Sequence, residues 1–417
     1  MRSAWIVSIG SELTLGQSVD TNAPWLAAQL AAQGIRCRRQ VTVPDELEAL
    51  SATFREAAAA SDLVVATGGL GPTADDLTRQ ALAAAAGLPL ELDAPSLEQI
   101  RAFFARRGRE MPSANRVQAL LPKGARPLPN TCGTAVGICL ELAGTPCYAL
   151  PGVPFEMREM FRREVLPHLP ALGDGQVVRF RRLHCFGTSE SAIGEALADL
   201  MRPGRNPAVG TTAELGVITV RINASADSPA AAEALLDDTE RLVRARLGTA
   251  VFGRDGETLA SVVGALLAAR GQTLGTAESC TGGLIAKLLT DVPGSSAYYL
   301  GGAVSYANEL KEALVGVPGE LLTAVGAVSE PVARAMAEGA RRAFGSSFAL
   351  ATTGIAGPTG GTPDKPVGLV FLALAGPQQT RVEAARFGSE SPRVVIRERA
   401  ARTALDLLRR ELIRQGP

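Results

Sequence analysis

The chain has 417 residues, 46% of them hydrophobic, and carries 42 Lys and Arg against 42 Asp and Glu. This length exceeds one ordinary core and, at roughly 150 residues per domain, predicts two or three domains. A formal charge of zero excludes any bulk attraction to nucleic acid or anionic lipid, so neither is expected as a partner. No apolar run approaches the roughly 18 residues of a membrane span and the N-terminus lacks an export pattern, so a cytoplasmic location is expected.

Alternating β and α patterns fill the first part of the chain and predict βα units on a largely parallel sheet. The expected strands are residues 4–9, 35–43, 62–67, 135–142 and 147–150. The expected helices are residues 21–33, 46–60, 75–86, 97–107 and 155–166. Residues 167–175 hold two prolines and two glycines and indicate a linker.

A small α+β module is expected next, followed by a second βα series. The module has strands at 177–185 and 215–223 and helices at 191–201 and 230–247. The second series has strands at 273–277, 303–306, 348–352 and 368–374 and a closing helix at 392–412. The fold class is therefore α/β with three domains, residues 1–170, 171–250 and 251–417.

Histidine is scarce, because only His168 and His184 are present, and both lie away from the glycine-rich motifs. A Ser-His-Asp triad or a multi-histidine metal site is therefore not expected, and hydrolysis would have to use carboxylates, hydroxyls, lysine or an oxygen-bound metal. Six cysteines without a CxxC pair predict reduced, mostly buried thiols. Arginine is the usual cation, so each lysine is either a chance survivor or a needed deprotonable amine. The four lysines are Lys123, Lys287, Lys311 and Lys365.

The first candidate site is a glycine loop between a strand and a helix, in the run DLVVATGGLGPTADDLT at residues 62–78. Backbone N–H groups of such a loop can converge on phosphate oxygens at the carboxyl end of a strand. Asp75 and Asp76 are expected at the start of the following helix. They are either Mg²⁺ ligands beside the phosphates or simply favourable charges at a helix N-terminus.

Four motifs in this part of the chain resemble the molybdopterin-binding family, in the order found in the N-terminal domain of CinA proteins. They are SIGSELTLGQSVDTNAPWLAAQLAAQG, GGLGPTADDLT, NRVQALLPKGARPLPNTCGTAVG and LPGVPFEM. The resemblance implies a divalent-metal-dependent ADP-ribose pyrophosphatase that gives AMP and ribose 5-phosphate. It implies metal ligands at Glu12, Asp75 and Asp76, and ligand contacts at Asp20, Asn22, Gly68, Gly69, Gly71, Thr73, Asn130, Gly133, Thr134 and Glu156.

The middle module resembles, by its position in that family, a KH-like domain. A KH module that binds RNA clamps the backbone with a GxxG loop. No GxxG occurs between Gln176 and Gly248. We therefore expect an architectural or dimerising role in preference to RNA recognition.

The second candidate site is TAESCTGG at residues 276–283, which follows a strand and opens a helix. Ser279, Cys280 and Thr281 are three adjacent candidate nucleophiles, and Gly282 and Gly283 allow backbone N–H groups to face a ligand. A helix cap with a packed cysteine would give the same local pattern. No GxSxG or SxxK signature accompanies it.

Three further motifs together with TAESCTGG resemble the C-terminal domain of CinA proteins, the nicotinamide-nucleotide amidohydrolase family. They are GGAVSYANELKEALVG, VSEPVARAMAEGA and ATTGIAGPTGGTPDKPVGLVFLA. The resemblance implies hydrolysis of nicotinamide mononucleotide (NMN) to nicotinic acid mononucleotide and ammonia without a cofactor. It implies Ser279 as nucleophile, with Lys311 and Tyr306 to activate it. It implies substrate contacts at Thr281, Gly282, Gly283, Asn308, Thr353, Gly354 and Gly357, with a phosphate contact from Arg393, Arg397 or Arg399, of which Arg397 and Arg399 are selected.

The sequence thus predicts a bifunctional hydrolase acting on small nucleotides, ADP-ribose and NMN, and forming a homo-oligomer, most simply a dimer. With no histidine available, a buried lysine whose pKa is lowered by burial can serve as the base for serine. Two alternatives remain open at this point. One is a molybdopterin-type nucleotidyl transferase, and the other is a non-enzymatic accessory protein for DNA uptake or RNA binding.

Overall fold

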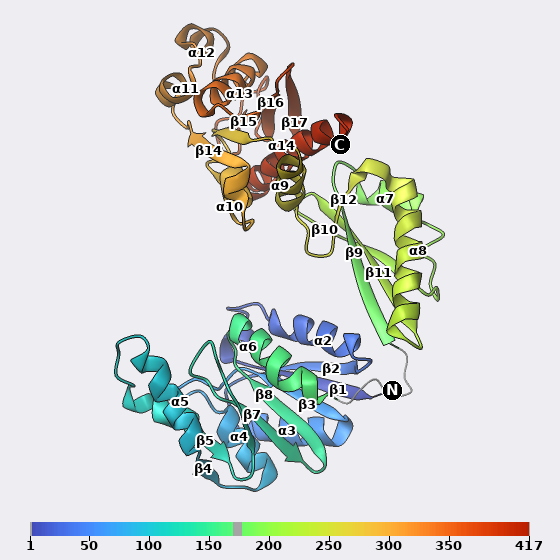
Figure 1. Ribbon diagram of the computed structural model, residues 1–417, viewed down its shortest axis with the longest axis vertical. Helices are drawn as coiled ribbons and strands as arrows, with labels where there is room; N and C mark the ends of the chain where they lie inside the picture. Colours follow the sequence, from blue (N-terminus) through green and yellow to red (C-terminus); the bar gives the residue numbers. More distant parts are fainter. Residues whose placement is uncertain (1, 170–176, 417) are drawn as a thin grey trace. The chain divides into compact units, whose positions relative to one another are not determined.

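The computed structural model describes residues 2–169 and 177–416 (Figure 1). Of the expected linker at 167–175, residues 170–175 lie outside the described residues. The chain forms two compact units, Met1–Arg179 with Ala224–Leu235, and Phe180–Asn223 with Leu236–Pro417. Within the described residues, no helix is long and apolar enough to cross a bilayer.

The N-terminal sheet has the strand order β2-β1-β3-β8-β7-β6. Its parallel strands are β1 (Ser3–Ile9), β2 (Arg36–Val43), β3 (Leu63–Thr67) and β8 (Thr145–Leu150), and β7 (Gly137–Leu142) and β6 (Arg126–Leu128) are antiparallel to their neighbours. This sheet confirms the expected strands of the first domain. Strand β6 was not expected from the sequence; it adds a short antiparallel edge to the sheet.

Helices cover both faces of the N-terminal sheet, and its central strands are therefore buried on both sides. One face packs on α2 (Asn22–Ala32) and α6 (Pro154–Met160) through Leu26, Leu30 and Met157. The other packs on α3 (Leu47–Ala60), α4 (Thr78–Ala86) and α5 (Ala94–Ala105) through residues such as Phe54 and Leu82. A small antiparallel pair, β4 (Leu90–Leu92) with β5 (Leu120–Pro122), lies beside α4. The ends of β1, β3 and β8 stay uncovered, and the glycine loop follows one of them.

The middle module is a four-stranded sheet with the order β10-β11-β9-β12. Its elements are β9 (Val177–Cys185), α7 (Glu190–Ala196), β10 (Ala208–Glu214), β11 (Val217–Ala226), α8 (Pro229–Leu247) and β12 (Val251–Arg254). Strands β10 and β12 were not expected from the sequence. Both lie at sheet edges and are short or mostly exposed, so neither has the alternating apolar pattern of a half-buried strand.

The C-terminal sheet has the order β14-β13-β15-β16-β17. Parallel strands β13 (Leu274–Glu278), β14 (Tyr299–Val304) and β15 (Phe348–Gly354) are followed by antiparallel β16 (Leu369–Ala375) and β17 (Thr380–Arg386). Helices α9 (Leu259–Ala269), α10 (Leu284–Thr290) and α14 (Arg393–Arg414) cover one face. Helices α11 (Asn308–Val315), α12 (Gly319–Val325) and α13 (Glu330–Phe344) cover the other. The edge strand β17 was not expected from the sequence.

Candidate active sites

A cavity of about 420 Å³ lies at the carboxyl ends of the N-terminal sheet. Gly10 follows β1, the loop from Gly68 to Pro72 follows β3, and Pro151 follows β8. Ligands of open α/β sheets bind at this edge because the loops after parallel strands meet there. The predicted glycine loop is therefore one wall of a cavity of small-molecule size.

Gly68 closes the space between two strand ends. Its amide donates to the Leu150 carbonyl at 3.0 Å, and its φ is +110°. A Cβ atom on this residue would lie 2.1 Å from the Ile9 carbonyl oxygen. Because that contact is with backbone, no side-chain rotation could relieve it, and the loop requires glycine here.

We expect Gly68→Ala to destabilise the N-terminal unit by more than the roughly 1–2 kcal/mol that a positive φ costs an L-residue. Gly87→Ala is the matched control, since Gly87 has φ +68° but open space around its Cβ position. Denaturant unfolding of the two variants measures the difference. Equal losses would contradict the steric contact with Ile9.

Asp75 and Asp76 do not lie in the first turn of α4, which corrects the expectation, because that helix begins at Thr78. The Asp76 carboxylate accepts from the Gly71 amide, the Thr73 amide and the Thr73 hydroxyl. Asp76 therefore holds the glycine loop in shape. Asp75 is exposed and lines the cavity.

Five carboxylates line this cavity, those of Glu12, Asp45, Asp75, Asp76 and Glu156. In residues 2–169 and 177–416, no three His, Cys, Asp or Glu side chains are grouped as a metal cage. Mg²⁺ does not need such a cage, because it keeps several waters and binds through one or two carboxylates and substrate phosphates. The donors fit that mode, with Glu12 and Asp75 the carboxylates least engaged by the loop.

Asn22 and Asn130 are buried, and their amide groups bond within the protein. Asn22 Nδ2 donates to Thr67 Oγ1 at 3.0 Å and to the Gly152 carbonyl at 2.8 Å. Asn130 Nδ2 donates to Glu156 at 2.6 Å, and its Oδ1 accepts from the Gly133 amide. The structure thus places both amides behind the cavity wall, as positioning groups.

Among the other predicted contacts near these two asparagines, some bond within the protein and others line the cavity. Asp20 accepts from the Asn22 amide at 2.9 Å and from the Ser8 hydroxyl at 2.5 Å. Thr134 and Glu156 line the cavity itself. Gly133 leaves room for Glu156, since a Cβ would lie 2.1 Å from that carboxylate. Gly69 and Gly71 line the cavity with Gly68, whereas exposed Thr73 does not.

Arg79 is a positioning residue that the sequence analysis missed. Its side chain is buried under the glycine loop, and Nη2 donates to the Leu70 carbonyl at 2.6 Å and to the Gly71 carbonyl. Burial lowers the pKa of this guanidinium to about 10. By holding these carbonyls inward, Arg79 leaves the loop amides on the cavity side. Its only sequence signal was a cation in the first turn of a helix whose later residues are apolar.

The second site lies at the carboxyl ends of the three parallel strands of the C-terminal sheet. Ser279 follows β13, Ser305 and Tyr306 follow β14, and Gly354 ends β15. Glu278 pairs in register with Val304 on one side and with Thr352 on the other. The strand before Ser279 is therefore central, and neighbours enter from both sides.

The loop from Ser279 to Gly283 is pinned by its neighbours. The Ser279 amide donates to the Thr352 carbonyl at 2.9 Å, and the Thr281 and Thr352 hydroxyls are 2.7 Å apart. Gly282 and Gly283 have φ of +61° and +89°. The Glu278 carboxylate accepts from the first amides of α10, at Ile285 and Ala286, at 3.0 and 2.8 Å. Among the described residues, the amide of partly exposed Gly283 bonds to no carbonyl and can face a ligand, whereas Thr281 is fully buried.

Cys280 is buried, and burial raises the pKa of its thiol to about 12. The reactive form of cysteine is the thiolate, so this residue is a thiol at neutral pH. We expect a thiol reagent at pH 7 to label Cys132, which is partly exposed, well before Cys280. Peptide mapping by mass spectrometry measures this order. Labelling of Cys280 first in the folded protein would contradict it.

Lys311 lies on α11 and is 1% exposed. Its Nζ donates to the Tyr306 carbonyl at 3.0 Å, and burial lowers its pKa. The neutral amine is therefore more accessible here than in an ordinary lysine. The nearby Ser305 hydroxyl is buried and has no partner among the described residues. Exposed Tyr306 touches Lys311 through its backbone, while its phenol oxygen bonds Arg393 at 2.9 Å.

The arginines of α14 separate by helix face. Arg397 donates to the Thr281 carbonyl at 2.6 Å, and Arg393 donates to the Gly357 carbonyl at 2.7 Å. Arg399 instead lies over the Phe387 ring, 5.1 Å from its centroid, and lines a different cavity. Residues two apart on a helix point about 200° apart, so Arg397 and Arg399 cannot serve one site. The structure replaces Arg399 with Arg393.

The remaining predicted contacts are mostly structural. The Thr353 hydroxyl is buried and donates to the Ala327 carbonyl at 2.7 Å. Gly354 allows β16 to approach, because a Cβ would lie 2.7 Å from the Leu369 carbonyl oxygen. Gly357 stands in the loop held by Arg393. Asn308 is exposed at the start of α11, without a side-chain partner in the described part of the chain.

Family models match three consecutive parts of this chain. The probable molybdopterin binding domain matches residues 5–171, the damage-inducible protein CinA KH domain residues 180–253, and the CinA C-terminal domain residues 256–412. A putative competence-damage inducible protein of Symbiobacterium thermophilum is 47% identical over 98% of this chain and 99% of its own length. A CinA-like protein of Geobacter metallireducens is 47% identical over 98% of each.

A solved structure of competence/damage inducible protein CihA from Agrobacterium tumefaciens is 44% identical and covers 37% of this chain and 93% of its own, with a TM-score of 0.36. The fold and the matched models define a three-domain α/β protein that joins a molybdopterin-binding-type domain, a KH domain and a CinA C-terminal domain. The chain belongs to the CinA family. The expected family and fold class are confirmed.

Proposed function

We propose that this protein is a bifunctional hydrolase of pyridine-nucleotide salvage. The N-terminal site would cleave ADP-ribose with water to AMP and ribose 5-phosphate. The C-terminal site would hydrolyse NMN to nicotinic acid mononucleotide and ammonia. The observation that carries the proposal is the buried Lys311 beside the Ser279 loop, because it supplies a base in a chain with two histidines.

In the N-terminal site the glycine loop and the carboxylates would have different tasks. The Gly69 and Leu70 amides would bind phosphate oxygens, and Asp76 and Arg79 keep the loop in the required shape. Glu12 and Asp75 would hold a divalent cation, which supplies charge neutralisation for the diphosphate when it is bound. This division explains why the two adjacent aspartates differ in exposure.

In the C-terminal site Ser279 would attack the carboxamide carbon of NMN. Its hydroxyl proton would pass to Lys311 Nζ and from there to the departing ammonia. The amide of Gly283 would hold the oxyanion. Water would then hydrolyse the acyl-serine, with Lys311 taking the proton of the water and returning it to the departing Ser279 oxygen. Arg393 and Arg397 would meet the phosphate of NMN, since both donate to carbonyls of the loops around this site.

Metal removal tests the division between the two sites. We expect chelation to lower ADP-ribose cleavage by at least about 10²-fold while deamidation of NMN is unchanged, because the N-terminal cavity is lined by five carboxylates that would hold the cation, whereas the proposed steps at Ser279 need no metal. Product analysis on both substrates, with and without chelator, measures this. Asp75→Asn should raise the metal concentration needed for half-maximal cleavage, and Glu141→Gln, on exposed β7 surface, is its control. Equal loss of both activities in folded protein would contradict the proposal.

The alternatives make other predictions in the same assay. A molybdopterin-type transferase would release no ribose 5-phosphate from ADP-ribose. A non-enzymatic accessory protein would turn over neither substrate and would bind nucleic acid in a salt-dependent manner.

A further inference from the structure

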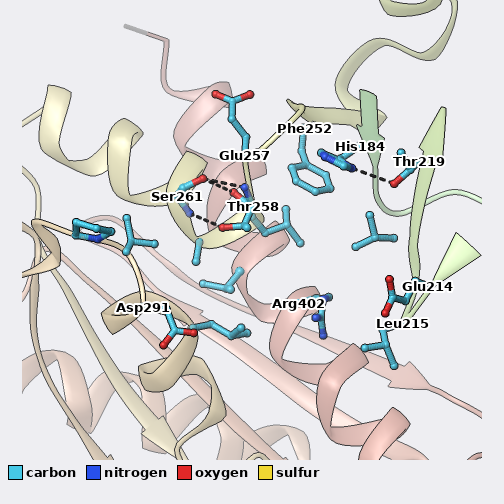
Figure 2. A pocket seen from close by; sticks show the side chains of 18 residues that line it. His184, Glu214, Leu215, Thr219, Phe252, Glu257, Thr258, Ser261, Asp291 and Arg402 are labelled. Atoms are coloured by element: carbon cyan, nitrogen blue, oxygen red, sulfur yellow. Dashed lines mark hydrogen bonds between the residues drawn. The ribbon is translucent and has the colours of Figure 1, made fainter. Parts of the chain in front are cut away.

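Another cavity is lined by residues of the middle module and of the C-terminal domain. All of these residues belong to one compact unit of the chain. Its volume is about 500 Å³, which is the size of a small-molecule site. The β10–β11 hairpin, β9, β12, the start of α9, the end of α10 and α14 all contribute residues (Figure 2). None of these residues belongs to either active site described above.

The pocket has an aromatic and aliphatic lining. The His184 and Phe252 rings stack with their centroids 5.8 Å apart and their planes 25° apart. His184 Nε2 lies 2.8 Å from the Asp255 carbonyl, which can only accept, so this nitrogen carries a proton. Its Nδ1 lies 3.0 Å from the Thr219 hydroxyl, as Figure 2 shows. The other apolar lining residues are Leu215, Val217, Leu259, Leu288, Val292, Pro293 and Leu405.

Most polar groups in the pocket already have partners. Thr258 and Ser261 form the capping box of α9, Asp291 pairs with Lys287 at 2.6 Å, and Glu257 accepts from the Arg254 amide at 2.7 Å. Each of these groups is thus held by at least one hydrogen bond or ion pair within the protein. They form the rim of the pocket.

Glu214 and Arg402 are the exceptions, and Figure 2 shows both side chains among the residues around the pocket. Glu214 pairs with Val217 through its backbone in the β10–β11 hairpin, but its carboxylate has no hydrogen bond or ion pair to another described residue. Arg402 pairs through Nη1 with Glu398, which leaves its other N–H donors available. The pocket therefore presents one free acceptor and one free donor beside an apolar, aromatic wall.

The charge of the lining excludes phosphorylated ligands. Glu214, Glu257 and Asp291 are acidic, and Arg402 is the one arginine or lysine among the lining residues. Asp291 is paired with Lys287 and Arg402 with Glu398, so Glu214 and Glu257 leave the lining acidic and repel a phosphate group. A flat ligand with an amino group for Glu214 and a ring acceptor for Arg402 fits the same surroundings.

We propose that this pocket binds an uncharged, planar, amino-bearing heterocycle of nucleobase size, as the free base or its nucleoside. The apolar walls and the His184–Phe252 stack would hold the ring system. Glu214 would accept from the exocyclic amino group, and Arg402 would donate to a ring nitrogen. Binding at this pocket does not depend on either proposed hydrolytic activity.

Adenosine is the probe, and calorimetry on the full chain with chelator present measures its binding. We expect saturable binding that Glu214→Gln weakens by at least about tenfold, since a charged acceptor is lost. Glu214 is exposed, so this change does not threaten folding. Glu320→Gln, another exposed glutamate of the same unit, should leave binding unchanged. Inosine, which lacks the amino group, and AMP, which adds a phosphate, should each bind more weakly than adenosine.

The dependence on Glu214 locates the bound adenosine, because the N-terminal cavity contains no residue from the β10–β11 hairpin. Absence of saturable binding, or equal binding in Glu214→Gln, would overturn the proposal. AMP binding more tightly than adenosine in a Glu214-dependent manner would also overturn it. If Glu214→Arg dissociates an oligomer in sedimentation and adenosine does not bind, the pocket is a contact between copies of this chain and the proposal fails.

Discussion

Ser279→Ala is expected to lower NMN deamidation by at least about 10³-fold, because removal of a covalent nucleophile usually reduces the rate by this much or more. Ser279 follows the central parallel strand, and its loop offers an amide at Gly283 that bonds to no carbonyl among the described residues. The neighbouring thiol cannot replace it, since the pKa of Cys280 is raised to about 12 by burial. Turnover of NMN by purified variants measures the effect.

Cys280→Ala is the matched control for Ser279→Ala, because it changes the adjacent buried position. It should cost stability through a lost packing contact but reduce turnover only modestly. ADP-ribose cleavage should be unaffected in both variants. Near-normal deamidation in Ser279→Ala together with loss in Cys280→Ala would transfer the nucleophile to cysteine.

Lys311→Met is expected to lower deamidation by about 10² to 10⁴-fold, the usual contribution of a general base. Lys311→Arg should lower deamidation to the same extent, because a guanidinium does not release its proton. In the wild type, burial lowers the pKa of Lys311, and the active form is the neutral amine. Deamidation should therefore rise with pH through that lowered pKa, and protonation should switch it off on the acid side.

The pH profile and a stability measurement distinguish catalysis from folding at Lys311. Methionine removes a buried amine with one described carbonyl partner, so Lys311→Met should retain the thermal stability of the wild type. Lys287→Met is the control, since Lys287 is exposed and forms an ordinary i,i+4 pair. A folded Lys311→Met variant with unchanged turnover and an unchanged pH profile would show that another group is the base.

Local sequence patterns determined the strands and helices that are buried or strongly periodic. The glycine loop after β3 and the loop after β13 were both placed correctly, because a buried strand, glycines and a helical run are adjacent in the chain. The order of the three domains followed from the same patterns. The edge strands β10, β12 and β17 escaped notice, since an edge strand is defined by its hydrogen-bonded neighbour and not by its own apolar pattern.

Only the tertiary structure decided which polar residues face a cavity. Asp75 and Asp76 are adjacent and chemically identical, yet Asp76 is used by the loop amides while Asp75 is exposed. Arg397 and Arg399 are equally basic, yet the helical rotation of α14 sends only Arg397 to the Ser279 loop. Composition left open whether any lysine is needed, and only the tertiary structure showed that Lys311 is buried. Such choices depend on groups far apart in the chain, whose distances and desolvation exist only after folding.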